Sequence, residues 1–436
     1  MIQRNINSVS FKTLGCKLNQ SETDAISAKF KEKGFEIRPF GEESDLTILN
    51  TCTVTNDADS KSRSTIRKAI KTSPKGRIVV TGCYAQVNPE EIEKISGVDL
   101  ILGSDEKYHI FDYLDRLNQG KNEEPLTFVN EQGDFDSVSA DGFVSATSRT
   151  RAFLKIQEGC DYYCSYCIIP FARGKARSRN FNETLDECKK LASQGYHELV
   201  LTGINIGTYE DEEHSFVELL QSMEKIDGLK RIRISSIEPN TVSDELMQLV
   251  ADSDVLCPHF HIPLQAGHND ILKAMNRKYI LDDYSQLMAR FKRILPHAAL
   301  GTDIIVGFPG ETDEHFQSTL NFVENNPFSY LHIFRYSART GTVASKLVNP
   351  VDFHIAKKRS SILHELAKKK KHEFAEKFIG TREPVLFDQW KDNVLSGYTN
   401  HYIRVDVQGH QNQLNTIENV KLTSYSKGQF KGNIVT

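Results

Sequence analysis

Three cysteines lie close together in the run E-G-C-D-Y-Y-C-S-Y-C at residues 158–167, namely Cys160, Cys164 and Cys167. Thiolates two or three residues apart can bind three irons of a [4Fe-4S] cluster and leave the fourth iron open to another ligand. A structural zinc site needs four protein ligands, and this loop contains neither a fourth cysteine nor a histidine. Disulfides and unreactive buried thiols are poorer explanations, because free cysteines rarely cluster without a metal. The loop therefore predicts an iron–sulfur site that can bind a further ligand.

The sequence around these cysteines resembles that of a known superfamily. The spacing C-x3-C-x2-C, with the aromatic Tyr166 before the last cysteine, resembles the signature of radical SAM enzymes. In that superfamily the open iron binds the amino and carboxylate groups of S-adenosyl-L-methionine (SAM). The longer run C-I-I-P-F-A-R-G-K-A-R-S-R, residues 167–179, resembles the methylthiotransferases, which insert sulfur into a C–H bond and methylate it. The resemblance makes Arg173, Arg177 and Arg179 candidate substrate contacts.

The composition indicates an intracellular protein with several domains. Its 436 residues are enough for about three domains. A charged fraction of 26% and a net charge of −4 exclude a general attraction to nucleic acid, so any RNA contact must be local. No apolar run reaches the roughly 20 residues of a membrane helix, and the amino terminus lacks the apolar core of a signal peptide. We therefore expect a cytoplasmic protein without membrane contact, whose eight cysteines are reduced.

Residues 1–118 are predicted to form an amino-terminal domain in which strands and helices alternate. Expected strands are 8–14, 46–50, 77–81 and 98–102, and expected helices are 21–33, 57–71, 89–94 and 108–117. This alternation predicts an α/β fold with a doubly wound parallel sheet.

Three further cysteines follow the expected strands of this domain. Cys16, Cys52 and Cys83 each come within three residues of a strand end. Because parallel strands end at the same edge of a sheet, these cysteines should converge there. Their wide spacing also allows three unrelated loop cysteines. The resemblance to methylthiotransferases implies that they hold an auxiliary [4Fe-4S] cluster, which carries the sulfur to be transferred.

A connector is expected at 119–145, followed by a larger α/β domain at 146–376. Its expected strands are 151–157, 198–202, 231–235, 256–262, 300–306 and 330–334, and its expected helices are 182–194, 216–225, 243–251, 269–275, 281–294 and 313–323. Six strand–helix units predict an incomplete (βα)6 barrel similar to a TIM barrel. In such a barrel the working residues lie on the loops at the carboxyl ends of the strands.

The strand ends of this domain offer residues suited to a charged cofactor. By resemblance, the SAM pocket is formed by Tyr166, Gly203, Asn205, Ser236, Glu238, Gln265 and Val306. Two positions depart from the family pattern: Asn205 stands where an acidic residue is usual, and Ala266 stands where a serine is usual. His259, His261 and His268 are interpreted as pocket-lining or structural histidines and not as metal ligands.

The carboxyl-terminal third suggests RNA binding. Arg339 could contact a substrate phosphate, and the basic helical stretch at 357–371 could follow an RNA backbone, although a solvated helix face is the ordinary explanation. Short alternating strands at 377–436 predict a small β-barrel that resembles the TRAM domain, an RNA-binding module. Tyr398, Tyr402 and Tyr425 could stack on bases, although tyrosines in strands are more often packing residues.

The resemblance implies a tRNA methylthiotransferase with two [4Fe-4S] clusters and SAM as radical source and methyl donor. The residues around Cys16 and Cys52 resemble those of the branch that acts on N6-threonylcarbamoyladenosine beside the anticodon. Alternatives within the family are isopentenyladenosine in tRNA or an aspartate of a ribosomal protein. Expected partners are the tRNA anticodon stem-loop, an electron donor protein and a sulfur source. A zinc-stabilised RNA-binding protein without enzymatic activity is the alternative from another class.

Overall fold

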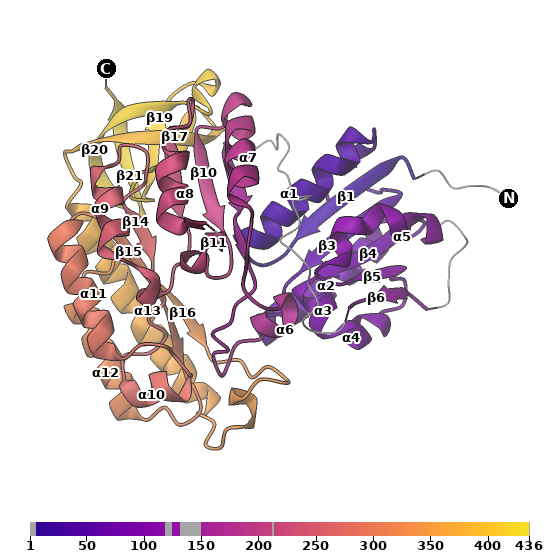
Figure 1. Ribbon diagram of the computed structural model, residues 1–436, viewed down its shortest axis with the longest axis horizontal. Helices are drawn as coiled ribbons and strands as arrows, with labels where there is room; N and C mark the ends of the chain where they lie inside the picture. Colours follow the sequence, from indigo (N-terminus) through magenta and orange to yellow (C-terminus); the bar gives the residue numbers. More distant parts are fainter. Residues whose placement is uncertain (1–5, 118–123, 131–149, 212, 436) are drawn as a thin grey trace.

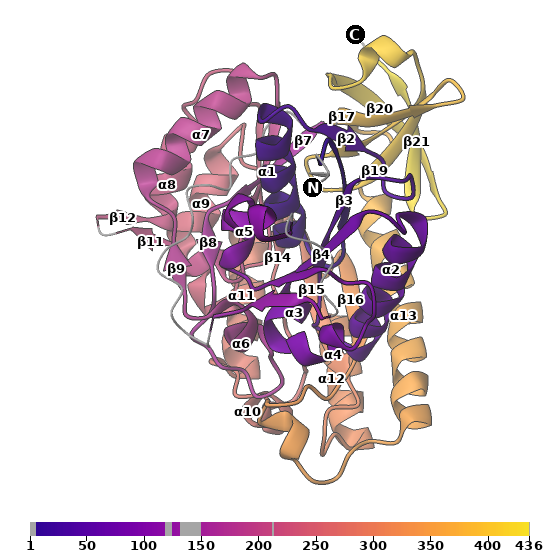
Figure 2. The same cartoon turned by 90° about the vertical axis from the view of Figure 1, so that its right-hand side faces the viewer.

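The protein is described by a computed structural model that covers residues 6–117, 124–130, 150–211 and 213–435 (Figure 1). It has three parts: an N-terminal domain (6–130), a core domain (150–376) and a C-terminal barrel (377–435). Figure 1 shows the N-terminal domain on one side of the core domain and the C-terminal barrel above it. Figure 2 shows the same arrangement from the side of the N-terminal domain.

The N-terminal domain contains a six-stranded parallel sheet in the order β2-β1-β3-β4-β5-β6. Its strands are β1 (Ser8–Thr13), β2 (Glu36–Arg38), β3 (Leu46–Thr51), β4 (Arg77–Gly82), β5 (Leu100–Leu102) and β6 (Leu126–Phe128). Its helices are α1 (Lys17–Glu32), α2 (Asn56–Thr72), α3 (Cys83–Val87), α4 (Pro89–Glu93) and α5 (Ile110–Leu117), with a 3-10 turn η1 (Glu106–His109) before α5. Strand β3, L-T-I-L-N-T, is buried along its whole length, as expected of a central strand. The predicted parallel sheet is confirmed.

Several details of this domain differ from the sequence-based expectation, which contains neither the short strands β2 and β6 nor the short helix α3. Strand β6 lies inside the expected connector, of which 124–130 are described, because three residues are too few to show a period. Helix α1 begins at Lys17, four residues before the expected start at Ser21, because Cys16 is extended and acts as its N-cap. The residues directly after Cys16 are mostly polar, so the first turn of α1 shows no apolar periodicity in the sequence.

The core domain has six parallel strands. Strands β13, β10 and β7 form one sheet, β14, β15 and β16 form another, and the bridges Ile232–Leu256 and Ser236–His261 join them. The strands are β7 (Arg151–Lys155), β10 (Glu198–Thr202), β13 (Arg231–Ile234), β14 (His259–His261), β15 (Ala299–Val306) and β16 (Tyr330–Arg335). The helices between them are α6 (Ile169–Arg173), α7 (Phe181–Ser193), α8 (Phe216–Met223), α9 (Asp244–Asp252), α10 (Asn269–Ala274), α11 (Leu281–Ile294) and α12 (Asp313–Asn325). The predicted incomplete barrel of six units is confirmed, and its open edges are β7 and β16.

The two open edges are covered by other parts of the chain. Helix α1 of the N-terminal domain packs on β7, where the Ser21 hydroxyl donates a hydrogen bond to the Phe153 carbonyl at 2.9 Å. The long helix α13 (Phe353–Glu376) packs along β16 and leads into the C-terminal barrel. The barrel mouth therefore faces the N-terminal domain.

The C-terminal barrel is closed by β17 (Arg382–Lys391), β18 (Val394–Thr399), β19 (Arg404–Gln408), β20 (Ile417–Ser426) and β21 (Gln429–Ile434). This confirms the predicted small β-barrel. It sits at the amino-terminal end of the core strands, where Arg231 donates to the carbonyls of Tyr398 and Pro384 at 2.9 and 2.7 Å. Arg231 and Arg233 are buried because they flank the buried Glu198, which offsets their charge.

Candidate active site: two groups of three cysteines

The first group of cysteines lies on the loop between β8 (Gln157–Glu158) and α6, at the carboxyl end of the first core strand. The loop is fixed by its backbone: Ser165 donates to the Met275 carbonyl at 2.9 Å and accepts from the Ala344 amide at 2.7 Å. Cys160, Cys164 and Cys167 are half-buried, and none forms a disulfide. Burial raises the pKa of Cys160 to about 11 and that of Cys167 to about 12. A metal ion must therefore displace the thiol protons before these sulfurs can act as its ligands.

The second group comes from three separate strand ends, and the structure brings these ends together. Cys16 is the N-cap of α1, Cys83 is the first residue of α3, and Cys52 follows β3. A Cβ added to Gly15 would lie 2.9 Å from the Cys52 sulfur, so only glycine allows the Cys16 turn to approach Cys52 this closely. Burial, together with the neighbouring Cys83 and Cys16, raises the pKa of Cys52 to about 12. Two of the three cysteines thus lie at helix amino termini, where the helix dipole favours a thiolate.

Arg173 connects the segment after the first cysteine loop with Cys83 of the second group. It follows the first cysteine loop at the end of α6, and its Nε donates to the Cys83 sulfur at 3.3 Å. Its other nitrogens donate to Glu22 at 2.7 Å, to Glu158 at 2.6 Å and to Asn19 at 2.6 Å. Arg173 is 1% exposed. The prediction that it contacts RNA is therefore wrong, because its guanidinium already forms hydrogen bonds with buried side chains between the two domains.

The buried charges around Arg173 favour an anion at Cys83. Glu22 and Glu158 carry two negative charges, whereas Lys107, Lys155 and Arg173 carry three positive ones. The side chains of these five residues are all at most 6% exposed. One positive charge is thus left over next to the Cys83 sulfur. Burial raises the pKa of Cys83, while Arg173 lowers it. The arginine therefore favours the thiolate form of Cys83.

Arg339, also predicted to contact substrate, is 5% exposed, and it donates to Asp59 at 2.6 Å, to Thr53 at 2.7 Å and to Asn56 at 2.7 Å, all from the N-terminal domain. Arg179 is 4% exposed. For these two buried arginines the predicted substrate contact is wrong. Arg177 is half-buried and donates to the carbonyls of Arg173 and Lys175, and its substrate contact stays a prediction.

Replacing Arg339 with Ala is expected to destabilise the interface by about 3–5 kcal/mol, because Asp59 would be left buried without a counter-charge. Arg335 provides the matched control at the same interface. It lies 4.0 Å from Asp57, which is 92% exposed, so Arg335→Ala should cost at most about 1 kcal/mol. Thermal unfolding of the two variants measures the difference. Equal losses would contradict the assigned role of Arg339.

The expected SAM residues lie around the mouth of the core barrel, near the first cysteine loop. A Cβ at Gly203 would lie 2.9 Å from the Gln157 carbonyl oxygen, so the second strand end approaches this loop closely. Gln157 also accepts hydrogen bonds from the amides of Ile204 and Asn205 at 2.9 Å each. Asn205 is 2% exposed, and among the described residues neither polar atom of its side chain has a hydrogen-bond partner. An unsatisfied buried amide beside the cysteine loop is suited to a polar ligand.

Glu238 and Arg277 form an ion pair beside Cys164. Arg277 also donates to the Cys164 sulfur at 3.1 Å and to the Tyr279 hydroxyl at 3.2 Å. Burial raises the pKa of Glu238, whereas Arg277 lowers it. Arg277 was not among the predicted site residues, because N-R-K-Y after a helix gives no local signal of a role.

The remaining predicted pocket residues frame the same mouth. Tyr166 meets Phe308, in the turn after β15, edge to face with ring centroids 6.5 Å apart. Val306 ends β15 and is fully buried, so its backbone and not its side chain is available to a ligand. Gln265 has a positive φ of 64° and is bridged to Ile304. Ser236 is bridged to His261.

A cavity of about 870 Å³ lies between the three parts of the molecule. Its wall includes Cys16 and Lys17 from the N-terminal domain, Gly203 and Ser236 from the core strand ends, and Asp303 from within β15. Helix α13 adds His364, Lys368 and Lys371, and the C-terminal barrel adds Tyr398, Tyr402, Arg404 and Tyr425. The cavity thus touches both the second cysteine group and the expected SAM pocket.

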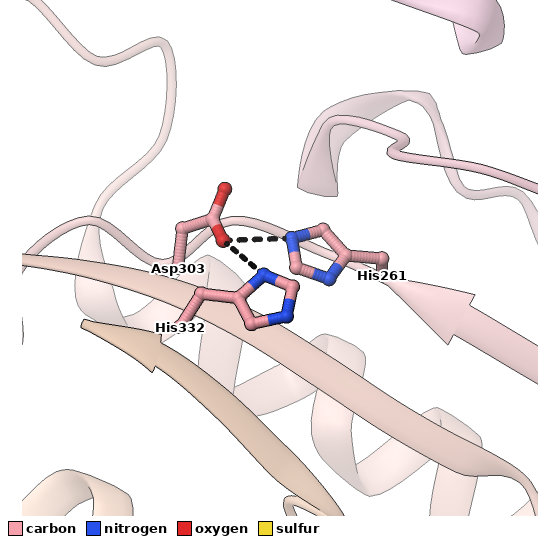
Figure 3. A group of neighbouring side chains, drawn as sticks. All are labelled: His261, Asp303 and His332. Atoms are coloured by element: carbon pink, nitrogen blue, oxygen red, sulfur yellow. Dashed lines mark ion pairs between the residues drawn. The ribbon is translucent and has the colours of Figure 1, made fainter. Parts of the chain in front are cut away.

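Three side chains form a polar cluster on the cavity wall (Figure 3). His261 Nε2 lies 2.9 Å from Asp303 Oδ1, and His332 Nδ1 lies 3.3 Å from the same oxygen. Burial would raise the pKa of Asp303, but the two imidazoles hold it well below its usual range. His259 and His261 also contact the Tyr330 hydroxyl, at 2.9 and 3.2 Å. Both histidines thus have hydrogen-bond partners, while His268 caps α10 elsewhere, so the three do not form one site.

Tyr398 and Tyr402 stack on each other with ring centroids 4.9 Å apart. Arg151 and Arg233 lie over the Tyr402 ring. These tyrosines therefore pack at the junction of the barrel and the core and also face the cavity.

Comparison with known proteins was made on sequence and on structure. Residues 8–103 match the model of the uncharacterized protein family UPF0004, and residues 154–323 match the Radical SAM superfamily. The chain is 40% identical to the threonylcarbamoyladenosine tRNA methylthiotransferase MtaB of Bacillus subtilis, over 97% of this chain and 96% of that protein. It is 37% identical to MtaB of Thermotoga maritima, over 97% and 96%. It is 34% identical to the tRNA-2-methylthio-N(6)-dimethylallyladenosine synthase of Clostridium novyi, over 97% and 95%.

Among solved structures, the radical S-adenosylmethionine methyltransferase TsrM of Kitasatospora setae, with cobalamin and a [4Fe-4S] cluster bound, has a similar fold. The TM-score is 0.56 at 15% sequence identity, over 76% of this chain and 75% of that one. Within the described ranges, every helix is too short or too polar to cross a bilayer.

Proposed function

We propose that this chain, which belongs to the radical SAM methylthiotransferase family, converts N6-threonylcarbamoyladenosine beside the anticodon of tRNA to its 2-methylthio derivative. The observation that carries the proposal is that Arg173, on the helix after the first cysteine loop, donates to Cys83 of the second group, while Cys16 of that group lines the cavity that also contains Gly203 and Ser236. A radical SAM enzyme with one cluster needs only the first group.

The residues present fit two [4Fe-4S] clusters. Each group offers three thiols that form no disulfide, and the irons of a cubane accept one thiolate each. Cys160, Cys164 and Cys167 would hold the cluster that binds SAM. Cys16, Cys52 and Cys83 would hold the auxiliary cluster, with the excess positive charge at Arg173 offsetting its negative charge. When bound, these groups supply the one-electron cleavage of SAM and the sulfur and methyl group that are transferred.

The chain's own residues position the cofactor and exclude water. The Asn205 amide, which has no partner among the described residues, and the Glu238 carboxylate are suited to the polar methionyl end of SAM. Glu238 is held by Arg277 in this structure, so SAM binding would exchange one cation partner of Glu238 for another. Tyr166 and Phe308 close the pocket from the side of β15.

The tRNA would enter from the side of α13 and the C-terminal barrel. Lys357, Lys358 and Lys369 are exposed on α13, whereas Arg359 and Lys370 are buried and bind protein groups. The barrel resembles a TRAM domain, and its Arg404 reaches the cavity wall. We further propose that the enzyme works in the cytoplasm with an electron donor protein and a sulfur source.

Nucleoside analysis of tRNA from a deletion strain tests this function. Loss of the 2-methylthio-threonylcarbamoyl nucleoside, with accumulation of its unmethylthiolated precursor, is the expected result. The 34% identity to the Clostridium novyi synthase makes the isopentenyladenosine reaction the second candidate. Selective loss of the methylthio-isopentenyl nucleoside would contradict our proposal and support that candidate.

A further inference from the structure

The cavity beside the second cysteine group carries more positive than negative charge. Among its described wall residues, Lys17, Lys368, Lys371 and Arg404 are basic, and Asp303 is the single acidic one. The charge of Asp303 is already engaged by His261 and His332. Lys368 is paired with Glu365 at 2.7 Å. Lys17 and Lys371 have no ion-pair partner in the described part of the chain, so an anionic ligand would be stabilised here.

Lys17 is the first residue of α1, directly after Cys16, and its Nζ lies 5.4 Å from the centre of the Tyr402 ring. The Nζ of Lys371 lies 3.3 Å from the Cβ position of Gly428 in the C-terminal barrel. Lys17 and Cys16 line the same cavity, so a group held by Lys17 would share this cavity with a cysteine of the second group.

His332 lies on the wall of the same cavity. Its Nδ1 faces Asp303 (Figure 3), and its side chain is 56% exposed. The carboxylate of Asp303 fixes the orientation of the ring.

We propose that Lys17 binds the carboxylate that the threonylcarbamoyl group carries, and that this contact determines the choice of N6-substituted adenosine. The inference rests on the proposed function and names a residue that recognises its substrate. An isopentenyl group is apolar and would leave the Lys17 ammonium unpaired in a partly buried cavity, which disfavours it. The same cation could instead bind a phosphate of the RNA backbone, and the experiment separates these two sources.

The test uses reconstituted holoenzyme and two anticodon stem-loop RNAs. One carries N6-threonylcarbamoyladenosine, and the other carries the threoninamide analogue, in which the carboxylate is replaced by a neutral amide. For the wild type, kcat/KM should fall about 10- to 100-fold on the amide RNA, as expected for loss of a charge-assisted contact. For Lys17→Met, kcat/KM should fall by a similar factor on the carboxylate RNA, with little further loss on the amide RNA.

Three controls keep the result interpretable. Lys31→Met removes an exposed lysine at the other end of α1 and should behave as wild type. Lys17→Arg should retain the preference for the carboxylate RNA. Iron content and the visible spectrum report whether Lys17→Met still carries its clusters, which a merely structural role beside Cys16 would change.

The outcomes separate the inference from the function on which it rests. If Lys17→Met lowers kcat/KM equally on both RNAs, Lys17 binds a backbone phosphate or supports the cluster, and the inference is wrong. If Lys17→Met has wild-type activity on the carboxylate RNA, the inference is wrong as well. If the wild type instead modifies only isopentenyladenosine RNA, it is the proposed function that fails.

Discussion

Cys52→Ala is expected to form 5′-deoxyadenosine from SAM while its methylthiolated product falls by more than about 100-fold. Cys52 belongs to the second group, so its loss removes one of three ligands from the proposed auxiliary cluster. The first group, at Cys160, Cys164 and Cys167, lies on a different loop and keeps its backbone contacts. Anaerobic reactions with a chemical reductant, analysed for both products, measure the two activities separately.

Cys188→Ala is the matched control for this variant. Cys188 is also a buried cysteine, but it lies in α7 within the core of the barrel domain and not at either site. It should retain both activities. If Cys52→Ala still makes methylthiolated RNA at the rate of Cys188→Ala, the second group carries no sulfur and the two-cluster account fails.

Cys164→Ala should abolish both activities, because the radical is expected to arise at the cluster of the first group. Cys164 is contacted by Arg277, which in turn holds Glu238, so the site loses its metal ligand and the anchor of Arg277 together. We expect 5′-deoxyadenosine to fall below detection and the iron content to fall by about half. The auxiliary cluster should remain.

The control for Cys164→Ala is Cys257→Ala, a buried cysteine at the opposite end of the core strands beside Arg233. This variant should cleave SAM as the wild type does. Formation of 5′-deoxyadenosine by Cys164→Ala at a rate close to that of Cys257→Ala would show that SAM is cleaved elsewhere.

The convergence of Cys16, Cys52 and Cys83 followed from the sequence because it depends on a regular rule. Each cysteine comes directly after a predicted strand, and parallel strands end at one edge of their sheet. Strand and helix periods of two and 3.6 residues are local, so the barrel strands and helices were also predictable. Strand β6, with three residues, was too short for such a pattern.

Residues whose role depends on distant partners were not predictable. Arg173, in the run P-F-A-R-G-K, was taken for a phosphate contact, and its burial is determined by Glu22 and Asn19, about 150 positions earlier. Arg339 was misassigned for the same reason, because Asp59 lies in another domain. Arg277, Gln157 and His332 carry no local motif, and only the fold places them beside Cys164, Asn205 and Asp303.

The central claim is that two groups of three cysteines each hold an iron–sulfur cluster. Iron and zinc analysis of anaerobically purified protein, together with a variant in which Cys16, Cys52 and Cys83 are all Ala, tests it most directly. We predict about eight irons per chain in a brown, oxygen-sensitive wild type and about four in the triple variant, with no zinc. A colourless protein with zinc, or an iron content that the triple variant leaves unchanged, would contradict the account.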